Sequence, residues 1–290
     1  MNIKTNIPWL FKIIAKIILS ELPVNYSFWR LLNIFRHGAM EEPAYAFNIF
    51  KKHFKNYKNK KTNFVALELG PGDSLFSALT AYAFGSKSFY LIDTRNFAQN
   101  DIRYYKRLAT YLINKGFNIP DLAGIKNLND YLSLCNAQYY TSGLNSFQLI
   151  EDGSIDFIYS QAVLEHIKKA DFLNTMIQLR RVIKPDGACS HTIDLQDHLG
   201  GSLNNLRFKE STWESDIISN AGFYTNRIRY NEMLNLFYKA GFKVKVIKVK
   251  KWKKLPLPKS KMSKQFKILS SKELCVSGFD VILKPDTAYS

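Results

Sequence analysis

From residue 62 onward, short apolar stretches alternate with helical patterns, and this alternation constrains the fold more than any other feature. FVALEL (64–69) and IDFIYS (155–160) have the β-branched and aromatic content of buried strands. Helices between successive strands require crossover connections and a parallel sheet covered on both faces. The sequence therefore predicts an α/β, Rossmann-like fold with a seven-stranded, mostly parallel sheet. The expected strands are 64–69, 87–92, 137–140, 155–160, 188–193, 242–249 and 274–283, and the main expected helices are 74–84, 97–115, 163–167, 171–183 and 231–240. The last two strands have no evident helix between them, which leaves them free to pair antiparallel.

Basic residues are concentrated at two places in the chain. Lys and Arg number 41 and Asp and Glu number 24, which gives a formal net charge of +17. Residues 243–272 contain 12 Lys and no acidic residue, and residues 1–61 contain 11 basic and 3 acidic residues. We expect a basic amphipathic helical extension at 1–61 and one large globular domain at 62–290, with insertions at about 199–230 and 251–273. The basic segments suit a nucleic-acid backbone or an anionic membrane surface.

The apolar stretch from Trp9 to Leu19 is interrupted by Lys12 and Lys16, which lie on one helical face. A membrane-spanning helix needs about 20 apolar residues with few charges, and this stretch does not meet that requirement. It predicts an amphipathic helix that either packs on the globular body or anchors the protein at a membrane interface. Three widely spaced cysteines without a CxxC motif indicate a reducing environment. We therefore expect a cytoplasmic protein, with peripheral attachment to the inner face of the membrane left open.

The segment Glu68-Leu-Gly-Pro-Gly-Asp-Ser74 follows the first expected strand. Glycines at this position let a ligand approach the backbone at the carboxyl end of a parallel sheet. The dinucleotide fingerprint G-x-G-x-x-G fails here, because its third glycine would fall on Leu75. The pattern E/D-x-G-x-G-x-G, which serves S-adenosylmethionine, fits Glu68, Gly70 and Gly72, with the small Ser74 at its last position. An acidic residue on the turn suits the ammonium and sulfonium groups of that cofactor.

Asp93 ends the second expected strand, 25 residues after Glu68. A carboxylate at this place can accept hydrogen bonds from both hydroxyls of a ribose. A dinucleotide and S-adenosylmethionine would use it in the same way, so Asp93 indicates a ribose without distinguishing the two cofactors.

Four segments, in this order and spacing, resemble the class I S-adenosylmethionine-dependent methyltransferases: ELGPGDS (68–74), LID (91–93), DGSIDFIYSQAVLEHI (152–167) and LRRVIKPDGACSHTIDL (179–195). The resemblance covers about residues 62–250 and 274–283, and it implies S-adenosylmethionine as the cofactor and an antiparallel last strand. It also implies that the loop at 141–144 flanks the adenine, although this loop lacks the usual acidic residue. The residues that it assigns to cofactor binding are Glu68, Gly70, Pro71, Gly72, Ser74, Asp93, Thr94 and Gln161. The flanks resemble a bacterial subgroup associated with sugar and cell-surface polysaccharide pathways.

Methyl transfer to oxygen usually needs a base, or a metal that lowers the pKa of the hydroxyl. The expected catalytic residues are His166, His191, Asp194 and His198, at the carboxyl ends of the fourth and fifth strands. Strand alternation places residues 191 and 194 on opposite faces, so a bend after Asp194 would be needed to bring Asp194, Asp197 and His198 together. Such a group would suit Mg or Mn. A metal-free base and a structural role are the other interpretations, and we assign no metal site.

The two insertions bear on the acceptor. The segment 199–230 holds aromatic and arginine residues, which suit a sugar or anionic acceptor site and equally a packed lid. The basic segment 248–267 is typical of a solvated loop, although its interleaved Trp252 and Phe266 also suit a surface contact with anionic lipid or nucleic acid. We expect methyl transfer to a hydroxyl of a saccharide, glycolipid or related small acceptor. The alternatives are an RNA methyltransferase and a cofactor-binding module without turnover, although residues 160–163 (SQAV) lack the signature of amino-nitrogen methylation.

Overall fold

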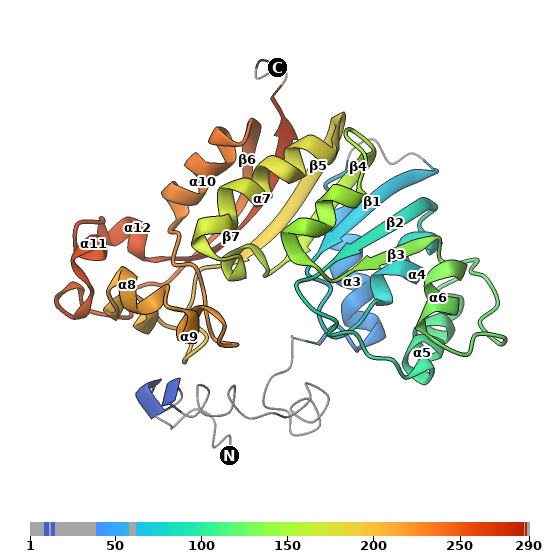
Figure 1. Ribbon diagram of the computed structural model, residues 1–290, viewed down its shortest axis with the longest axis horizontal. Helices are drawn as coiled ribbons and strands as arrows, with labels where there is room; N and C mark the ends of the chain where they lie inside the picture. Colours follow the sequence, from blue (N-terminus) through green and yellow to red (C-terminus); the bar gives the residue numbers. More distant parts are fainter. Residues whose placement is uncertain (1–8, 12, 15–38, 58–61, 287, 289–290) are drawn as a thin grey trace.

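The computed structural model describes residues 9–11, 13–14, 39–57, 62–286 and 288 (Figure 1). Its centre is one seven-stranded sheet with the order β3-β2-β1-β4-β5-β7-β6. β7 pairs antiparallel with both of its neighbours, and the other pairings are parallel. The predicted fold class and the antiparallel last strand are therefore confirmed. The strands are β1 (Phe64–Leu69), β2 (Ser86–Ile92), β3 (Ala137–Tyr140), β4 (Ile155–Gln161), β5 (Ile183–Asp194), β6 (Phe242–Lys251) and β7 (Val276–Pro285).

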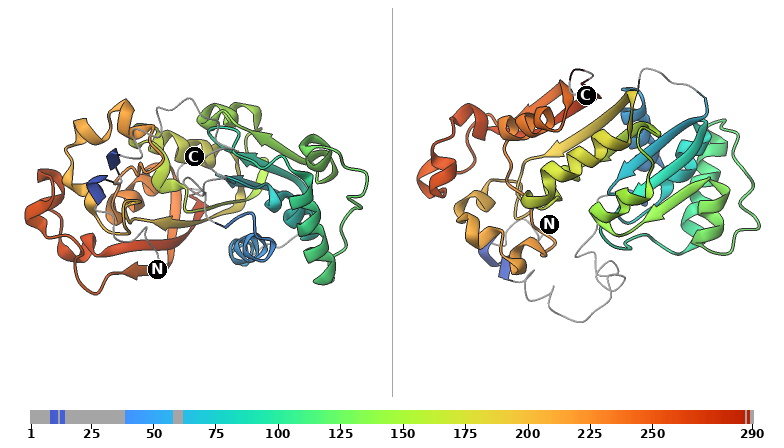
Figure 2. Two further views of the ribbon diagram at one scale, coloured as in Figure 1. Left: turned by 90° about the horizontal axis from the view of Figure 1, so that it is seen from below. Right: turned by 45° about the horizontal axis from the view of Figure 1, so that its top comes forward.

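Helices cover the two faces of the sheet unequally (Figure 2). On one face, α3 (Pro43–Phe54), α4 (Phe76–Ala83), α5 (Ile102–Asn114) and α6 (Leu128–Leu134) enclose an apolar cluster that contains Phe50, Phe157 and Tyr105. On the other face, α7 (Lys169–Val182) and α10 (Tyr230–Lys239) enclose a cluster that contains Leu67 and Met176. Because α3 contributes Phe47, Phe50 and Phe54 to the first cluster, this part of the basic extension is an integral part of the core.

Shorter elements connect the larger ones. They are η2 (Gly143–Leu149), η3 (Leu164–His166), η4 (Asn204–Arg207), α8 (Glu210–Trp213), α9 (Asp216–Ser219), η5 (Lys259–Lys261), α11 (Lys264–Lys267) and α12 (Ser271–Leu274). The helix expected over 163–167 is thus a single 3₁₀ turn, η3. Within the described ranges, no helix combines the length and the apolar character that crossing a membrane requires.

One helix begins later than the sequence pattern predicts, and another begins earlier. The helix expected over 97–115 begins at Ile102, because the side chain of Asp101 caps it and accepts from the backbone N–H of Arg103. The backbone N–H of Phe97 instead donates to the hydroxyl of Tyr139 at 3.3 Å, so residues before Asp101 are held as a loop. The next helix, α7, begins at Lys169 rather than after Asp171, which lies in the first turn. The carboxylate of Asp171 in the first turn of α7 interacts favourably with the positive end of the helix dipole, so it stabilises the start of the helix without capping it.

The two insertions pack internally. Trp213, Phe223 and Tyr224 form a buried cluster, in which the indole N–H of Trp213 donates to the carbonyl of Thr225 at 2.7 Å. Phe266 is buried in a second cluster, against which Trp252 packs. The packed-lid interpretation of 199–230 is therefore the one that these contacts favour, and Phe266 is not placed for surface contact.

The described part of the N-terminal amphipathic segment packs on the first insertion. Residues 9–11 and 13–14 are helical, and Ile13 is buried in the same cluster as Trp213. The ring of Trp9 meets that of Phe208 edge to face, with 5.9 Å between the centroids. Residues 12 and 15–19 of the expected helix lie outside the described residues.

Candidate functional site

The turn after β1 is a close-packed glycine turn. Gly70 and Gly72 have φ angles of +72° and +67°, in the left-handed region that favours glycine. A Cβ atom added to Gly70 would lie 2.5 Å from Cγ2 of Val163, in the loop after β4. Pro71 and Ser74 are buried, and the hydroxyl of Ser74 accepts from the backbone N–H of Phe76 at the start of α4. The turn after β1 therefore packs directly against the loop that follows β4.

The carboxylate of Asp93 connects this turn to the end of β2. One oxygen accepts from the backbone N–H of Gly72 at 3.0 Å, and the other accepts from that of Thr94 at 2.7 Å. The backbone carbonyl of Asp93 accepts from the N–H of Gly143 at 2.9 Å. The loop at 141–144 therefore lies beside Asp93 and Thr94, the residues expected to hold a ribose. The structure thus brings together the turn, Asp93, Thr94 and this loop at the carboxyl edge of the sheet.

Glu68 lies beneath the turn and is 2% exposed. Burial raises the pKa of its carboxyl group to about 7, while the Ser77 hydroxyl, which donates to it, acts in the opposite direction. A buried carboxylate whose charge is penalised in this way gains most from a nearby cation. The ammonium and sulfonium groups of S-adenosylmethionine are such cations, so the carboxyl group of Glu68 beneath this turn fits that cofactor.

Gln161, at the end of β4, is bonded to a residue that the sequence pattern did not single out. Its side-chain oxygen lies 3.2 Å from Nε2 of His53 on α3, and Nδ1 of His53 lies 2.8 Å from the hydroxyl of Ser190. Burial lowers the pKa of His53 to about 4, so this imidazole is neutral near pH 7. Ala162 follows with a φ of +55°, a strained conformation for a non-glycine residue.

His191 is placed away from the other predicted catalytic residues. It is fully buried on the face covered by α7 and α10, where Nδ1 lies 2.7 Å from the hydroxyl of Ser160. Burial also lowers its pKa to about 3. A side chain without exposed surface cannot meet an acceptor from solution, so the geometry favours a structural role for His191.

His166 and His198 do come together, one from η3 and one from the segment after β5. Their ring centroids are 4.6 Å apart in an edge-to-face arrangement, and the side chain of His198 is exposed. Nδ1 of His166 lies 2.8 Å from the backbone carbonyl of Tyr224. Because a carbonyl can only accept, Nδ1 carries a proton, and in the neutral ring Nε2 is the basic nitrogen.

The bend after Asp194 does not assemble a ligand set. The carboxylate of Asp194 accepts from the backbone N–H of Gln196, and that of Asp197 accepts from Leu199 and Asn204. Both side chains thus stabilise the local turn. Among the described residues, no group of three or more His, Cys, Asp and Glu side chains is placed to hold a metal ion.

The first insertion is fastened to the loop after β4. The side chain of Asn226 donates to the carbonyls of Leu164 and Ile167, and its backbone N–H donates to the carbonyl of Glu165 at 2.7 Å. Glu165 is itself buried, accepts from the N–H of Asp194, and has a pKa raised to about 8 by burial. The insertion therefore sets the position of the loop that carries His166.

Comparisons with known proteins give one family match, over part of the chain. Residues 126–190 match the model of a family described as a methyltransferase domain, a segment that runs from before α6 into β5 and does not include the glycine turn. No curated protein sequence matches the chain.

Several solved structures are similar at low identity. An S-adenosylmethionine-dependent methyltransferase from Methanosarcina mazei is 17% identical, with a TM-score of 0.46 and coverage of 80% of this chain and 96% of that one. Phosphoethanolamine N-methyltransferase 2 from Haemonchus contortus, in complex with phosphomonomethylethanolamine and S-adenosylhomocysteine, is 15% identical, with a TM-score of 0.44. The similarity covers 82% of this chain and 53% of the Haemonchus chain.

The matched methyltransferase segment contains β4 and the loop of His166, and the cofactor turn expected for that activity lies directly against this loop through Gly70 and Val163. The family match thus covers 65 of the 290 residues and is to a methyltransferase domain.

Proposed function

We propose that the enzyme methylates a hydroxyl group of a saccharide, glycolipid or related small acceptor. The observation that carries this proposal is the pair His166 and His198, whose rings lie 4.6 Å apart at the carboxyl ends of β4 and β5. Val163, three residues before His166, packs on Gly70 of the cofactor turn. The imidazole of His166 therefore lies in the same loop that packs against the turn expected to bind the methyl donor.

The cofactor would be held by residues of three strand ends. The Gly70–Gly72 turn and Glu68 lie at β1, Asp93 and Thr94 follow β2, and Gln161 ends β4. Asp93 suits the ribose hydroxyls and Glu68 suits the positive charge of the methionine end. When bound, S-adenosylmethionine supplies a methyl carbon on a sulfonium, so that the acceptor oxygen gains the methyl group and sulfur keeps the electron pair.

His166 is the residue best suited to take the proton of the acceptor hydroxyl. The bond from Nδ1 to the Tyr224 carbonyl fixes the tautomer and leaves the basic electron pair on Nε2. Imidazole is the side chain best suited to accept a proton near neutral pH, and a positioned base typically contributes about 10²–10⁴-fold to the rate. His198, in contact with His166, would orient it or meet the acceptor.

The test is a methyl-transfer assay with labelled cofactor and a panel of neutral and charged saccharides, glycolipids and RNA. A hydroxyl acceptor gives an alkali-stable methyl ether, whereas a carboxyl acceptor gives an ester that alkali cleaves. Alkali-stable label in a saccharide or glycolipid fraction is the expected result. Label confined to RNA or to an alkali-labile product would contradict the proposal.

A peripheral membrane location is proposed for the same enzyme. The exposed side chains of Leu10, Phe11 and Ile14 are 48%, 63% and 47% accessible on the short helical segment that packs on the insertion, and they support contact with a bilayer interface. Each lysine of the basic 243–272 segment near an anionic surface adds about 1 kcal/mol. Sedimentation with anionic and neutral vesicles over a salt series tests this, and equal partition to both would contradict it.

A further inference from the structure

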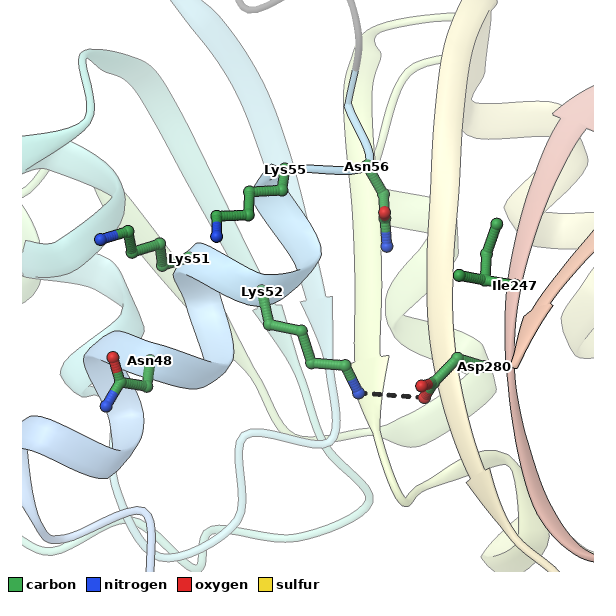
Figure 3. A pocket seen from close by; sticks show the side chains of 7 residues that line it. All are labelled: Asn48, Lys51, Lys52, Lys55, Asn56, Ile247 and Asp280. Atoms are coloured by element: carbon green, nitrogen blue, oxygen red, sulfur yellow. Dashed lines mark hydrogen bonds and ion pairs between the residues drawn. The ribbon is translucent and has the colours of Figure 1, made fainter. Parts of the chain in front are cut away.

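An open groove lies between α3 and the far edge of the sheet, outside the site described above (Figure 3). It has a volume of about 360 Å³. The residues that line it are Asn48, Lys51, Lys52, Lys55, Asn56, Ile247 and Asp280. Residues 48, 51, 52 and 55 share one face of α3 because they are three, four and seven positions apart. One wall of the groove is thus a polar helix face, where an apolar partner would find little to pack against.

On the opposite side, Ile247 of the edge strand β6 lines the groove, and lysines flank it along the same strand. Lys248 pairs in register with Asp280, and Lys250 with Gly278. Val249, which lies between these two lysines, packs against the apolar cluster under α10. Because neighbouring residues of a strand point to opposite faces, Lys248 and Lys250 lie on the face of the sheet that α3 covers. Lys245 lies two residues earlier, opposite Ile282, which packs against the cluster on the α3 side. All three lysines are exposed.

The groove has a strong excess of positive charge. Asp280 is the acidic residue among those that line it, and it is paired with Lys52 at 2.9 Å. Lys51 and Lys55 add two exposed ammonium groups on one side, and the β6 lysines add more on the other. This excess of positive charge makes the groove complementary to a negatively charged ligand.

The groove is connected to the proposed reaction centre. Lys52 donates to the hydroxyl of Thr192 at 2.6 Å, and Thr192 pairs in register with Gln161 across β4 and β5. The neighbouring His53 contacts Gln161 from the same helix. A ligand in contact with Lys52 would therefore be separated from Gln161, the residue expected to contact the cofactor, by the side chain of Thr192.

We propose that the groove binds the anionic portion of a saccharide acceptor that carries phosphate or carboxylate groups; this inference rests on the proposed function. The amides of Asn48 and Asn56 beside the lysines suit sugar hydroxyls next to an anionic group. None of the lining residues is aromatic or arginine, so the groove lacks the stacking platform by which proteins hold single-stranded RNA. Its concave shape suits a single chain better than the surface of a bilayer.

The experiment measures binding to the full-length protein with four probes. They are an oligosaccharide of uronic acids, a phosphorylated oligosaccharide, a neutral oligosaccharide of the same length and a short single-stranded RNA, with phosphatidylglycerol vesicles as a further arm. The test variant is Lys55→Ala/Lys248→Ala, which removes one exposed lysine that lines the groove and one exposed lysine of β6 opposite Asp280. The matched control is Lys87→Ala/Lys126→Ala, which removes the same charge from exposed positions on other elements.

At least one anionic oligosaccharide is expected to bind at least tenfold more tightly than the neutral one. The Lys55/Lys248 variant is expected to weaken that binding about three- to tenfold, the loss of two partly exposed ion pairs, and the control variant is not. Equal binding of the neutral oligosaccharide, or an unchanged affinity in the Lys55/Lys248 variant, would overturn the proposal. So would a charge-dependent preference for the RNA or the vesicles alone. Cofactor affinity is measured on the same samples. Failure to bind S-adenosylmethionine would refute the proposed function, whereas normal cofactor binding without binding of an anionic oligosaccharide would refute the role of the groove alone.

Discussion

The close approach of the glycine turn to the loop after β4 predicts a large and specific effect of Gly70→Ala. An alanine at a φ of +72° costs about 1–2 kcal/mol in backbone strain. Its Cβ would also lie 2.5 and 2.7 Å from the two methyl carbons of Val163, and overpacking of this kind adds about 1–3 kcal/mol. The free energy of unfolding should therefore fall by about 2–5 kcal/mol, measured by urea denaturation.

Two comparisons separate these contributions. Gly116→Ala has a similar φ of +81° with nothing within 4 Å of the new Cβ, so it should cost only the strain of about 1–2 kcal/mol. In the double variant Gly70→Ala/Val163→Ala the two methyl overlaps disappear and only the 3.2 Å contact with the Cβ of residue 163 remains, so the two substitutions should couple by about 1–3 kcal/mol. The reasoning is refuted if Gly70→Ala costs no more than Gly116→Ala, or if Val163→Ala restores nothing.

Three further outcomes follow from buried groups and from the histidine pair. The pKa of Glu68 is raised by burial from 4.5 to about 7, so wild-type stability falls as pH rises through this window, because the folded state holds a proton that the unfolded state has lost. Glu68→Gln should therefore raise the free energy of unfolding by about 3 kcal/mol at pH 8 and by little at pH 4.5, in urea titrations at the two pH values. His166→Ala should lower kcat about 10²–10⁴-fold while the cofactor Kd changes less than about twofold; a kcat within threefold of wild type would remove His166 as the base. Trp213→Ala, which empties a fully buried site and breaks the bond to Thr225, should cost about 3–5 kcal/mol, checked by thermal unfolding.

The fold and the glycine turn after β1 were predictable because each depends on local sequence. Strand composition and the spacing of Glu68, Gly70 and Gly72 are visible in a few residues, and helices between successive strands indicate parallel pairing. The start of α5 has a local signal in its cap, Asp101, whereas the hydrogen bond that holds Phe97 outside the helix comes from Tyr139, about 40 positions later in the chain.

The acceptor side of the site was predictable only in part. Strand alternation separated His191 from Asp194 correctly, but the depth of burial of His191 depends on α7 and α10, which alternation does not describe. His53 was missed because it lies on a helix of the basic extension, and its contact with Gln161 joins residues 108 positions apart. The aromatic residues of the first insertion have the same composition in a binding site and in a packed lid, so only the contacts of Trp213 decide between them.

Cofactor choice is tested by calorimetric titration of S-adenosylmethionine and of NAD into the wild-type protein and into Asp93→Ala. We expect micromolar binding of S-adenosylmethionine and no binding of NAD. Loss of the Asp93 carboxylate, which reaches the turn at Gly72 and suits the ribose hydroxyls, should weaken binding by about 1.5–3 kcal/mol, or about 10–150-fold. Unchanged affinity in Asp93→Ala, or tight binding of NAD, would contradict this expectation.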